Sequence, residues 1–436
     1  MRLPDALAWL DAHHNRELVP GGTATGADGL TLEVMERLCE LLGDPQRAYP
    51  VIHVTGTNGK GSVSAMVSAL LSAHGLSVGT YTSPHLHRLN ERITRNGEPI
   101  DDEELADVLT EVAGREGLLE VTPTWFEVVT AAALSWFAAV AVDVAVVEVG
   151  MLGRYDATNV VDATVAVVTN VGFDHTDGEG DWRVAVASEK AGIVGPDSVL
   201  VLGETDPRLR AVFAAEGPAA MWVAGEEFAA AAVRPAVGGQ VADLRTPQAA
   251  YDDVFIAAHG HHQADNAAMA VAATEAFFGR PVDSAVVGEV LGGLTLPGRF
   301  EVLGHQPLVV LDGAHNPPAA EAVANTLDHA FHATGRRLLV LGMLADRDPA
   351  AFLDALDPVR VDAVVTCTVP SPRAASATAL AAVVASRGLP VEAVEDPTDA
   401  VRRAVDVAEE DDLVLVTGSL YLVGAIRKSP GGAPGP

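Results

Sequence analysis

The sequence is poor in cysteine and in lysine, and each shortage narrows the class of protein. Cys39 and Cys367 are the only cysteines, they lie far apart, and both sit in apolar runs. This pattern predicts buried thiols in a reducing compartment and argues against a disulfide or a cysteine metal site. Only three of the 28 basic residues are lysines, namely Lys60, Lys190 and Lys428. A lysine inside this chain therefore raises the question of what arginine could not do there.

Positive charge is scarce as a whole. The formal net charge is -31 over 436 residues. Nucleic acid and anionic membranes both require a basic face, so neither is expected as a partner. The acidity is typical of a well-solvated surface, although a halophilic host would give the same excess.

No long, uninterrupted apolar run is present. The most apolar window, residues 130–150, contains Asp143 and Glu148. These charges favour a buried helix followed by a buried strand over a membrane helix. The first residues turn polar too early for a signal peptide. We therefore expect a cytoplasmic protein, and we expect it to be a monomer.

Hydrophobic residues make up 49% of the chain, which is enough for two α/β domains. Short β-branched runs alternate with helical patterns, which indicates parallel strands with crossover helices. The first series is "PVIHV", "SVGTYTS", "VDVAVVEVG", "ATVAVVTNVG" and "SVLVLGE", and the second is "PLVVL", "RRLLVLGML", "VDAVVTC" and "DLVLVTGS". The segment "LGGLTLPGRFEVLG" between them indicates a linker. We predict domains at 1–296 and 297–428, a disordered tail at 429–436, and an irregular stretch or small β excursion at 217–250.

The stretch "HVTGTNGKGSVSA" has the composition of a phosphate-binding loop between a strand and a helix. Gly56, Gly59 and Gly61 allow the backbone to approach a phosphate closely, and Lys60 adds a point charge. The loop is two residues shorter than the standard G-x-x-x-x-G-K-[ST], with a glycine between Lys60 and Ser62. An ordinary glycine turn is the alternative, but the rare lysine argues for a nucleotide phosphate site in a P-loop ATPase domain.

Other polar residues follow the predicted strands, where ligands of parallel sheets bind. Ser83, Glu148, Asp174 and His175 come at three such ends. Taken singly, each has an ordinary alternative: Ser83 as a capping residue, Glu148 as an ion-pair partner and His175 as a hydrogen-bonded histidine in a loop. Together they predict a magnesium site beside the phosphate loop, in which histidine is the least expected ligand.

Three further positions stand out. Lys190 lies at a predicted helix start, where a plain surface lysine is the alternative reading. Asp312 and His315 follow the strand "PLVVL". Arg299, in the linker, could reach back to a nucleotide held by the first domain.

The motifs occur in an order that resembles the folylpolyglutamate synthase and dihydrofolate synthase family, within the Mur-type ATP-dependent amide ligases. They run from about residue 28 to 425: "YPVIHVTGTNGKGS", "YTSPHLHRLNERI", "DATNVV", "FDHT", "EKAGI", "HHQADNAAMA", "PGRFEVL" and "LDGAHNP". The resemblance implies a P-loop ATPase domain followed by a smaller Rossmann-like domain. It also implies that ATP converts a carboxylate of dihydropteroate or of a folate glutamate tail into an acyl phosphate, which the amine of L-glutamate attacks.

The resemblance further implies roles for individual residues. Lys190 corresponds to a lysine carbamylated by carbon dioxide beside a second magnesium, which only a primary amine allows, and a monovalent cation is a further expected cofactor. The catalytic set is Lys60, Lys190 and His315. The ATP-binding set is Thr57, Asn58, Gly59, Lys60, Gly61, Ser62, Asn266, Arg299 and Asp312. The metal set is Ser83, Glu148, His175 and Lys190, and the acceptor-binding set is Thr124, Phe126, Glu127, Asp156 and Asn159.

The chain departs from the family pattern before "DATN". The usual G-L-G-G-R-L is "GMLGRY" here, so Leu152 replaces a glycine and Tyr155 a leucine. A bulkier lining could change the carboxylate acceptor without changing the ligase chemistry. A P-loop kinase or plain NTPase is an alternative, but it leaves Arg299, Asp312 and His315 without roles. A nucleotide- or metal-sensing protein is another, against which Lys60 and Glu148 argue.

Overall fold

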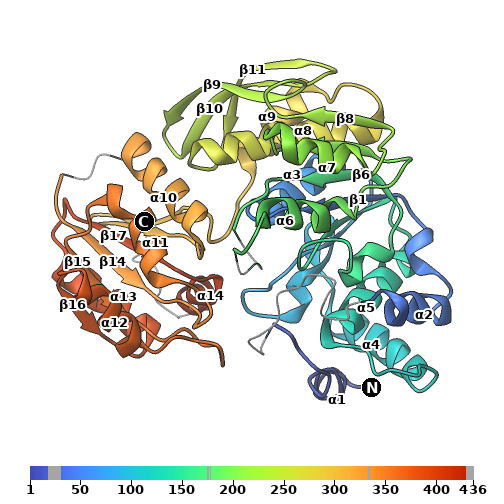
Figure 1. The fold of residues 1–436 in the computed structure, drawn as a ribbon, viewed down its shortest axis with the longest axis horizontal. Helices are drawn as coiled ribbons and strands as arrows, with labels where there is room; N and C mark the ends of the chain where they lie inside the picture. Colours follow the sequence, from blue (N-terminus) through green and yellow to red (C-terminus); the bar gives the residue numbers. More distant parts are fainter. Residues whose placement is uncertain (18–30, 174–175, 177, 332–333, 429–436) are drawn as a thin grey trace.

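Three β-sheets organise the protein, as seen in a computed structural model that describes residues 1–17, 31–173, 176, 178–331 and 334–428. One sheet has eight strands, one has three and one has six. Figure 1 shows the six-stranded sheet and its helices beside the rest of the chain. The predicted α/β class is confirmed.

The eight-stranded sheet carries the phosphate loop. All pairings between β2, β5, β1, β6, β7 and β8 are parallel, and β3 and β4 form an antiparallel edge. All five strands of the first predicted series are confirmed within it. In spatial order its strands are β4 Glu98–Pro99, β3 Ile93–Arg95, β2 Val78–Tyr81, β5 Val144–Glu148, β1 Val51–Thr55, β6 Ala163–Val168, β7 Val199–Leu202 and β8 Ala220–Val223.

Helices cover both faces of this sheet because its central strands are apolar on both sides. Ile52 and Val54 of β1 face one core, and Val51, which precedes them, faces the other. The first face packs against α3 Lys60–Ala73 and α8 His261–Phe278, with α9 Ser284–Gly293 beyond them. The second face packs against α1 Leu3–Leu10, α2 Glu33–Leu41, α4 Asp102–Glu116, α5 Trp125–Ala139, α6 Trp182–Ala191 and α7 Pro207–Ala214.

The stretch predicted as irregular or as a β excursion forms strands. An antiparallel sheet packs on α8 and continues to residue 256, beyond the predicted end at 250. Its strands are β9 Ala229–Ala236, β10 Gly239–Arg245 and β11 Ala250–Ile256.

The six-stranded sheet contains all four strands of the second predicted series. It is parallel except for β12, at its edge. In spatial order its strands are β12 Glu301–His305, β13 Leu308–Leu311, β17 Leu413–Thr417, β14 Arg337–Leu341, β15 Ala363–Thr366 and β16 Val391–Ala393. One face packs on α10 Pro317–Ala330, α11 Pro349–Ala355 and α12 Ala377–Ser386, and the other on α13 Pro397–Val407 and α14 Leu420–Lys428.

The proposed domain boundary near residue 297 falls between α9 and β12, and the predicted tail lies outside the described residues. The apolar window 130–150 forms the end of α5 and the buried strand β5. Within the described ranges, no helix is long and apolar enough to cross a membrane. Short 3-10 helices are η2 Pro45–Arg47, η3 Leu89–Arg92, η4 Ala157–Val160 and η5 Asp357–Val359.

Candidate active site

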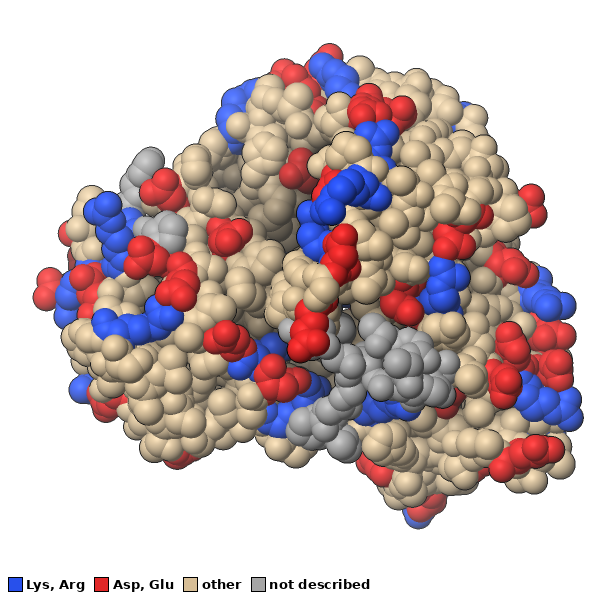
Figure 2. Space-filling model, viewed as in Figure 1, with Lys and Arg blue, Asp and Glu red and all other residues tan. Residues whose placement is uncertain are grey.

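A cavity of about 1010 Å³ lies where the carboxyl ends of the first sheet meet the six-stranded sheet. Its wall includes the phosphate loop, the ends of β2 and β5, the start of α8, and segments 312–315 and 419–421. Figure 2 shows acidic and basic side chains interspersed over the displayed face, without a continuous basic surface. The cavity, whose wall combines the phosphate loop with segments from both halves, is the candidate site.

The phosphate loop forms because glycine is required at two of its positions. A Cβ on Gly56 would lie 1.7 Å from the Thr169 hydroxyl oxygen. Gly59 has a φ of +88°, and a Cβ there would lie 2.8 Å from Asn266 Oδ1. Helix α3 starts at Lys60, and its first internal hydrogen bond runs from Val63 N–H to the Gly59 carbonyl. The N–H groups before Val63 lack helical partners, which is the arrangement that binds anionic phosphate.

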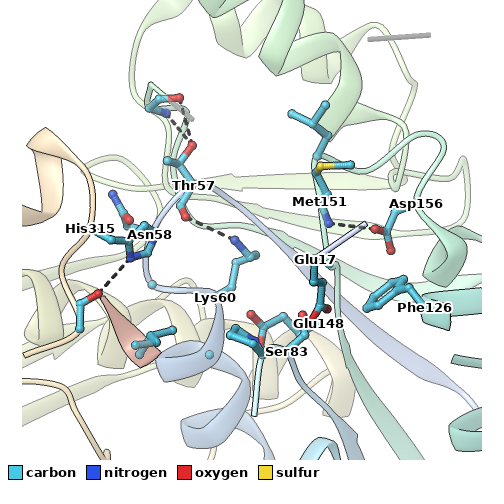
Figure 3. A pocket seen from close by; sticks show the side chains of 18 of the residues that line it. Glu17, Thr57, Asn58, Lys60, Ser83, Phe126, Glu148, Met151, Asp156 and His315 are labelled. Atoms are coloured by element: carbon cyan, nitrogen blue, oxygen red, sulfur yellow. Dashed lines mark hydrogen bonds between the residues drawn. The ribbon is translucent and has the colours of Figure 1, made fainter. Parts of the chain in front are cut away.

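Lys60 folds back over this loop. Its Nζ donates to the Gly56 carbonyl at 2.8 Å and to the Thr57 carbonyl at 3.3 Å. Figure 3 shows this contact, with Ser83 beside Glu148 at the same cavity. The ammonium group is thus held at the loop, next to where phosphate would bind.

Glu148 ends β5 as a buried carboxylate, 4% exposed. Burial raises its pKa to about 7, while Lys60, Arg299 and a hydrogen bond from the Ser83 backbone lower it. Its Oε2 has no hydrogen-bond partner in the described residues. A buried carboxylate oxygen without a partner, beside a serine, fits the oxygen donors that magnesium prefers.

The described residues alone do not provide a full set of metal ligands. His175 lies outside the described residues. Across the described ranges, no cluster of three or more His, Cys, Asp or Glu side chains could hold a metal by itself. A metal at Glu148 would therefore depend on phosphate oxygens for further ligands.

Lys190 lies in the last turn of α6 rather than at a helix start, because the helix begins eight residues earlier, at Trp182. It is only 3% exposed, which excludes the plain surface lysine. Lys190 itself does not line the cavity, but its neighbour Glu189 does. The Glu189 carbonyl accepts from Arg154 N–H at 2.8 Å, so the loop after β5 is packed on this turn.

The predicted acceptor residues divide into lining and supporting positions. Thr124, Phe126, Glu127 and Asp156 line the cavity. Glu127 also caps α5, since its Oε2 accepts from Thr124 N–H at 2.6 Å. Asp156 accepts from Met151 N–H at 2.8 Å and caps η4, so both carboxylates also have structural partners.

Asn159 is not among the lining residues. Its Nδ2 donates to the carbonyls of Arg154 and Gly192, each at 3.0 Å. It ties the loop after β5 to the end of α6.

Arg299 joins the two halves of the site. A Cβ on Gly61 would lie 3.8 Å from its Nη2, and a Cβ on Gly313 would lie 3.0 Å from its Nη1. The guanidinium therefore lies between the phosphate loop and the loop after β13.

Asp312 and His315, in that second loop, also line the cavity. Burial raises the pKa of Asp312, against the effect of Arg299 and of hydrogen bonds from the N–H groups of Ala314 and Phe300. His315 Nδ1 is 2.9 Å from the Gly313 carbonyl. A carbonyl only accepts, so Nδ1 carries the proton in that bond.

Several lining residues were not identified from the sequence. Glu17 lies in the cavity wall and forms a bidentate pair with Arg92, which is nearly fully buried. His262 lies in the first turn of α8, and burial lowers its pKa to about 4. The motif "HHQADNAAMA" contains His262 and could have identified it, whereas no motif contains Glu17.

The chain matches two family models, the Mur ligase middle domain over residues 54–274 and the Mur ligase, glutamate ligase domain over residues 298–420. A relative from Mycobacterium tuberculosis named dihydrofolate synthase/folylpolyglutamate synthase is 40% identical, over 91% of this chain and 89% of its own. A Bacillus subtilis relative of the same name is 32% identical, over 97% and 98%.

Solved structures match nearly the whole chain. Mycobacterium tuberculosis folylpolyglutamate synthase complexed with ADP and AMPPCP has a TM-score of 0.90 at 38% identity, covering 98% of this chain and 97% of that one. E. coli FolC with DHPP and ADP has a TM-score of 0.87 at 31% identity, covering 98% and 97%. The Yersinia pestis enzyme, complexed with AMPPNP and a Mn ion, has a TM-score of 0.84 at 31% identity, again covering 98% and 97%.

These matches confirm the resemblance of the motifs: the chain belongs to the Mur ligase family, in the group of folylpolyglutamate synthases and dihydrofolate synthases.

Proposed function

We propose that this chain is an ATP-dependent ligase that joins L-glutamate to dihydropteroate, to the glutamate tail of folates, or to both. One observation supports it most: a single cavity is lined by the phosphate loop, the buried Glu148 and, from the loops before β12 and after β13, Arg299 and His315. A simple NTPase has no need of the second sheet. A ligase does, because two substrates besides ATP must meet there.

The first step is phosphoryl transfer. A carboxylate oxygen of the acceptor attacks the γ-phosphorus of ATP, the bond to the β–γ bridging oxygen breaks, and ADP leaves. We propose that the N–H groups at Gly59–Ser62 hold the phosphates. Lys60 and Arg299 would stabilise the charge on the transferred group from two sides.

The second step is amide formation. The glutamate amine attacks the acyl carbon, its surplus proton leaves, and phosphate departs with the acyl oxygen. We propose His315 as the group that receives this proton. Its Nδ1 proton is engaged by the Gly313 carbonyl, so Nε2 is the ring nitrogen that can accept.

We propose that Ser83, Glu148 and His175 hold Mg²⁺ with phosphate oxygens, which when bound would neutralise negative charge on the phosphates. Lys190 would add its amine to carbon dioxide, losing a proton, and the resulting carbamate would hold a second Mg²⁺. Its burial on α6 supports a role other than surface charge. A monovalent cation is part of the same proposal.

The residues of the cavity wall that contact the carboxylate acceptor determine which acceptor binds. We propose that Phe126, Thr124 and Asp156 contact the acceptor. Leu152 and Tyr155 also line the cavity, so a different carboxylate acceptor is the alternative within the same chemistry. The two buried free cysteines fit a reducing cytoplasm, so we propose a cytoplasmic protein, and we propose that it is a monomer.

Purified protein with Mg²⁺, ATP, L-glutamate and either dihydropteroate or tetrahydrofolate should release phosphate only when all components are present. Mass spectrometry of the products should show acceptors extended by glutamate. Phosphate release that does not depend on an amine would instead indicate a kinase or NTPase. Phosphate release that requires a different carboxylate would reject the folate acceptor but not the ligase reaction.

A further inference from the structure

The backbone N–H and carbonyl of Asn58, in the middle of the phosphate loop, are both hydrogen-bonded to the two residues that follow β6. Its N–H donates to Asn170 Oδ1 at 3.0 Å. Its carbonyl accepts from Thr169 Oγ1 at 2.6 Å and from Asn170 Nδ2 at 3.0 Å. This N–H is thus already used, unlike those at the start of α3.

The side chain of Asn58 faces the other sheet. Its Nδ2 donates to Asn316 Oδ1 at 3.1 Å, and Asn316 Nδ2 donates back to Asn58 Oδ1 at 3.0 Å. The partners are 258 residues apart in the chain. Two amides paired in this way satisfy a donor and an acceptor on each side, which no carboxylate or hydroxyl pair reproduces.

Asn316 connects this pair to the reacting groups. It is 3% exposed and does not line the cavity. It caps α10, because its Oδ1 also accepts from Ala319 N–H at 3.0 Å. It directly follows His315, and Figure 3 shows His315 beside Asn58. The amide pair thus joins the loop that would hold ATP to the residue proposed to receive the proton.

We infer that Asn58 and Asn316 form an interdomain latch, and that Asn58 is a positioning residue rather than a phosphate ligand. The latch fixes His315 and the start of α10 against the phosphate loop. Losing it leaves ATP binding in place, because the N–H groups of α3 and Lys60 are untouched. Losing the latch lowers turnover, because His315 is no longer held in a fixed position relative to the phosphate loop. This inference rests on the proposed function only for the identity of the reaction.

The test compares Asn58→Ala, Asn316→Ser and the double variant. Serine keeps a cap on α10 but is too short to reach Asn58. Asp396→Ser, a cap change on α13 outside the cavity wall, is the matched control. The readouts are kcat, KM for ATP, and ADP binding by calorimetry.

We expect each single variant to lower kcat about tenfold, with ADP affinity within about twofold of wild type. The double variant should also lose about tenfold, because both changes remove one interaction. A loss of about a hundredfold in the double variant, as for independent effects, would overturn the latch. A second result would also overturn the latch: Asn58→Ala weakens ADP binding about tenfold or more and leaves kcat unchanged. That result would indicate that Asn58 is a phosphate ligand.

Hydrogen exchange separates this inference from the proposed function. Should wild type show no folate ligation, the latch still predicts faster exchange in the first turn of α10 when Asn58 is changed to alanine. Unchanged exchange there would reject the latch whatever the reaction. Exchange in the Asp396→Ser control should match wild type at α10.

Discussion

At the scale of residues, the site is a balance of buried charges. Glu148 and Asp312 are both buried carboxylates, and burial raises the pKa of each. Arg299 opposes that shift at both positions, and Lys60 does so at Glu148. Arg299 therefore stabilises two anions from two different sheets, which makes it a charge link across the cavity as well as a proposed ATP ligand.

The carbamate proposed at Lys190 can be tested by a single substitution. Lys190→Arg keeps the positive charge but removes the primary amine, so turnover should fall by about a hundredfold or more. Wild-type protein under ¹³CO₂ should show a carbamate carbon signal in NMR that the variant lacks. Lys428→Arg, the same change at the end of α14, should keep both the signal and the activity. Wild-type turnover in Lys190→Arg would refute the carbamate.

At the scale of elements, apolar runs were sufficient to predict the buried strands. Strands such as β5 are apolar throughout because helices cover both faces of the sheet. The edge strands β4, β12 and β16 and the short strand β3 beside β4 were not predicted, since an edge strand needs no continuous apolar run. β12 falls in the segment that was predicted as a linker. Ser83 and Glu148 could be placed because strand ends set their position.

Contacts between distant segments could not be predicted in this way. The pairing of Asn58 with Asn316 depends on how two sheets meet, and no spacing encodes it. Leu152 was noticed only as a departure from a glycine. The structure supplies the reason that glycine is usual there, because its φ is +59°, which is unfavourable for a branched side chain.

Asp412 shows how one side chain joins two neighbouring strands of the six-stranded sheet. It precedes β17 and accepts from Arg336 N–H at 2.6 Å, just before β14, and from Arg336 Nη2 at 2.8 Å. Burial alone raises its pKa, but the hydrogen bonds from the Glu409 and Arg336 N–H groups and the pairing with Arg336 outweigh it, so the net pKa is lowered. A carboxyl with a lowered folded pKa stabilises the fold at neutral pH, and this stability is lost as the pH falls through that pKa.

Asp412→Asn should therefore lower the free energy of unfolding by about 2 kcal/mol at pH 7. The difference from wild type should begin to shrink below about pH 4, where the carboxyl of the unfolded chain takes up a proton, and should shrink further as the pH falls through the lowered pKa of the folded state. Urea unfolding at pH 7 and at pH 3.5 measures both values. Asp411→Asn, at the exposed neighbouring residue, is the control and should change the free energy of unfolding little at either pH. A difference that does not change with pH would show that the ionised carboxylate is not what stabilises the strands.

At the scale of the whole molecule, the described residues of the two halves meet through contacts between individual side chains and loops. The main cores of the eight-stranded and six-stranded sheets are separate clusters. Besides the Asn58–Asn316 pair, Arg373 Nη1 donates to the Glu17 carbonyl at 2.9 Å. Leu86, which follows β2 and Ser83, packs with the core on α14. Relative placement of the halves therefore depends on individual residues.

Gly424 is one such residue. It lies in α14, and a Cβ there would be 2.6 Å from the Leu86 carbonyl oxygen, a backbone atom that cannot move cheaply. Gly424→Ala should therefore push α14 away from the loop after β2. Because each sheet keeps its own core, the protein should remain folded and should bind ADP within about twofold of wild type. Turnover should fall about fivefold or more, because the reacting groups of the two halves are misplaced.

The matched control is Gly288→Ala, also inside a helix but with nothing within 4 Å of the added Cβ. It should keep full activity and gain up to about 1 kcal/mol of stability from helix propensity. Small-angle X-ray scattering should show a larger radius of gyration for Gly424→Ala than for Gly288→Ala. Equal radii together with equal turnover would mean that α14 and the Leu86 loop need not touch during the reaction.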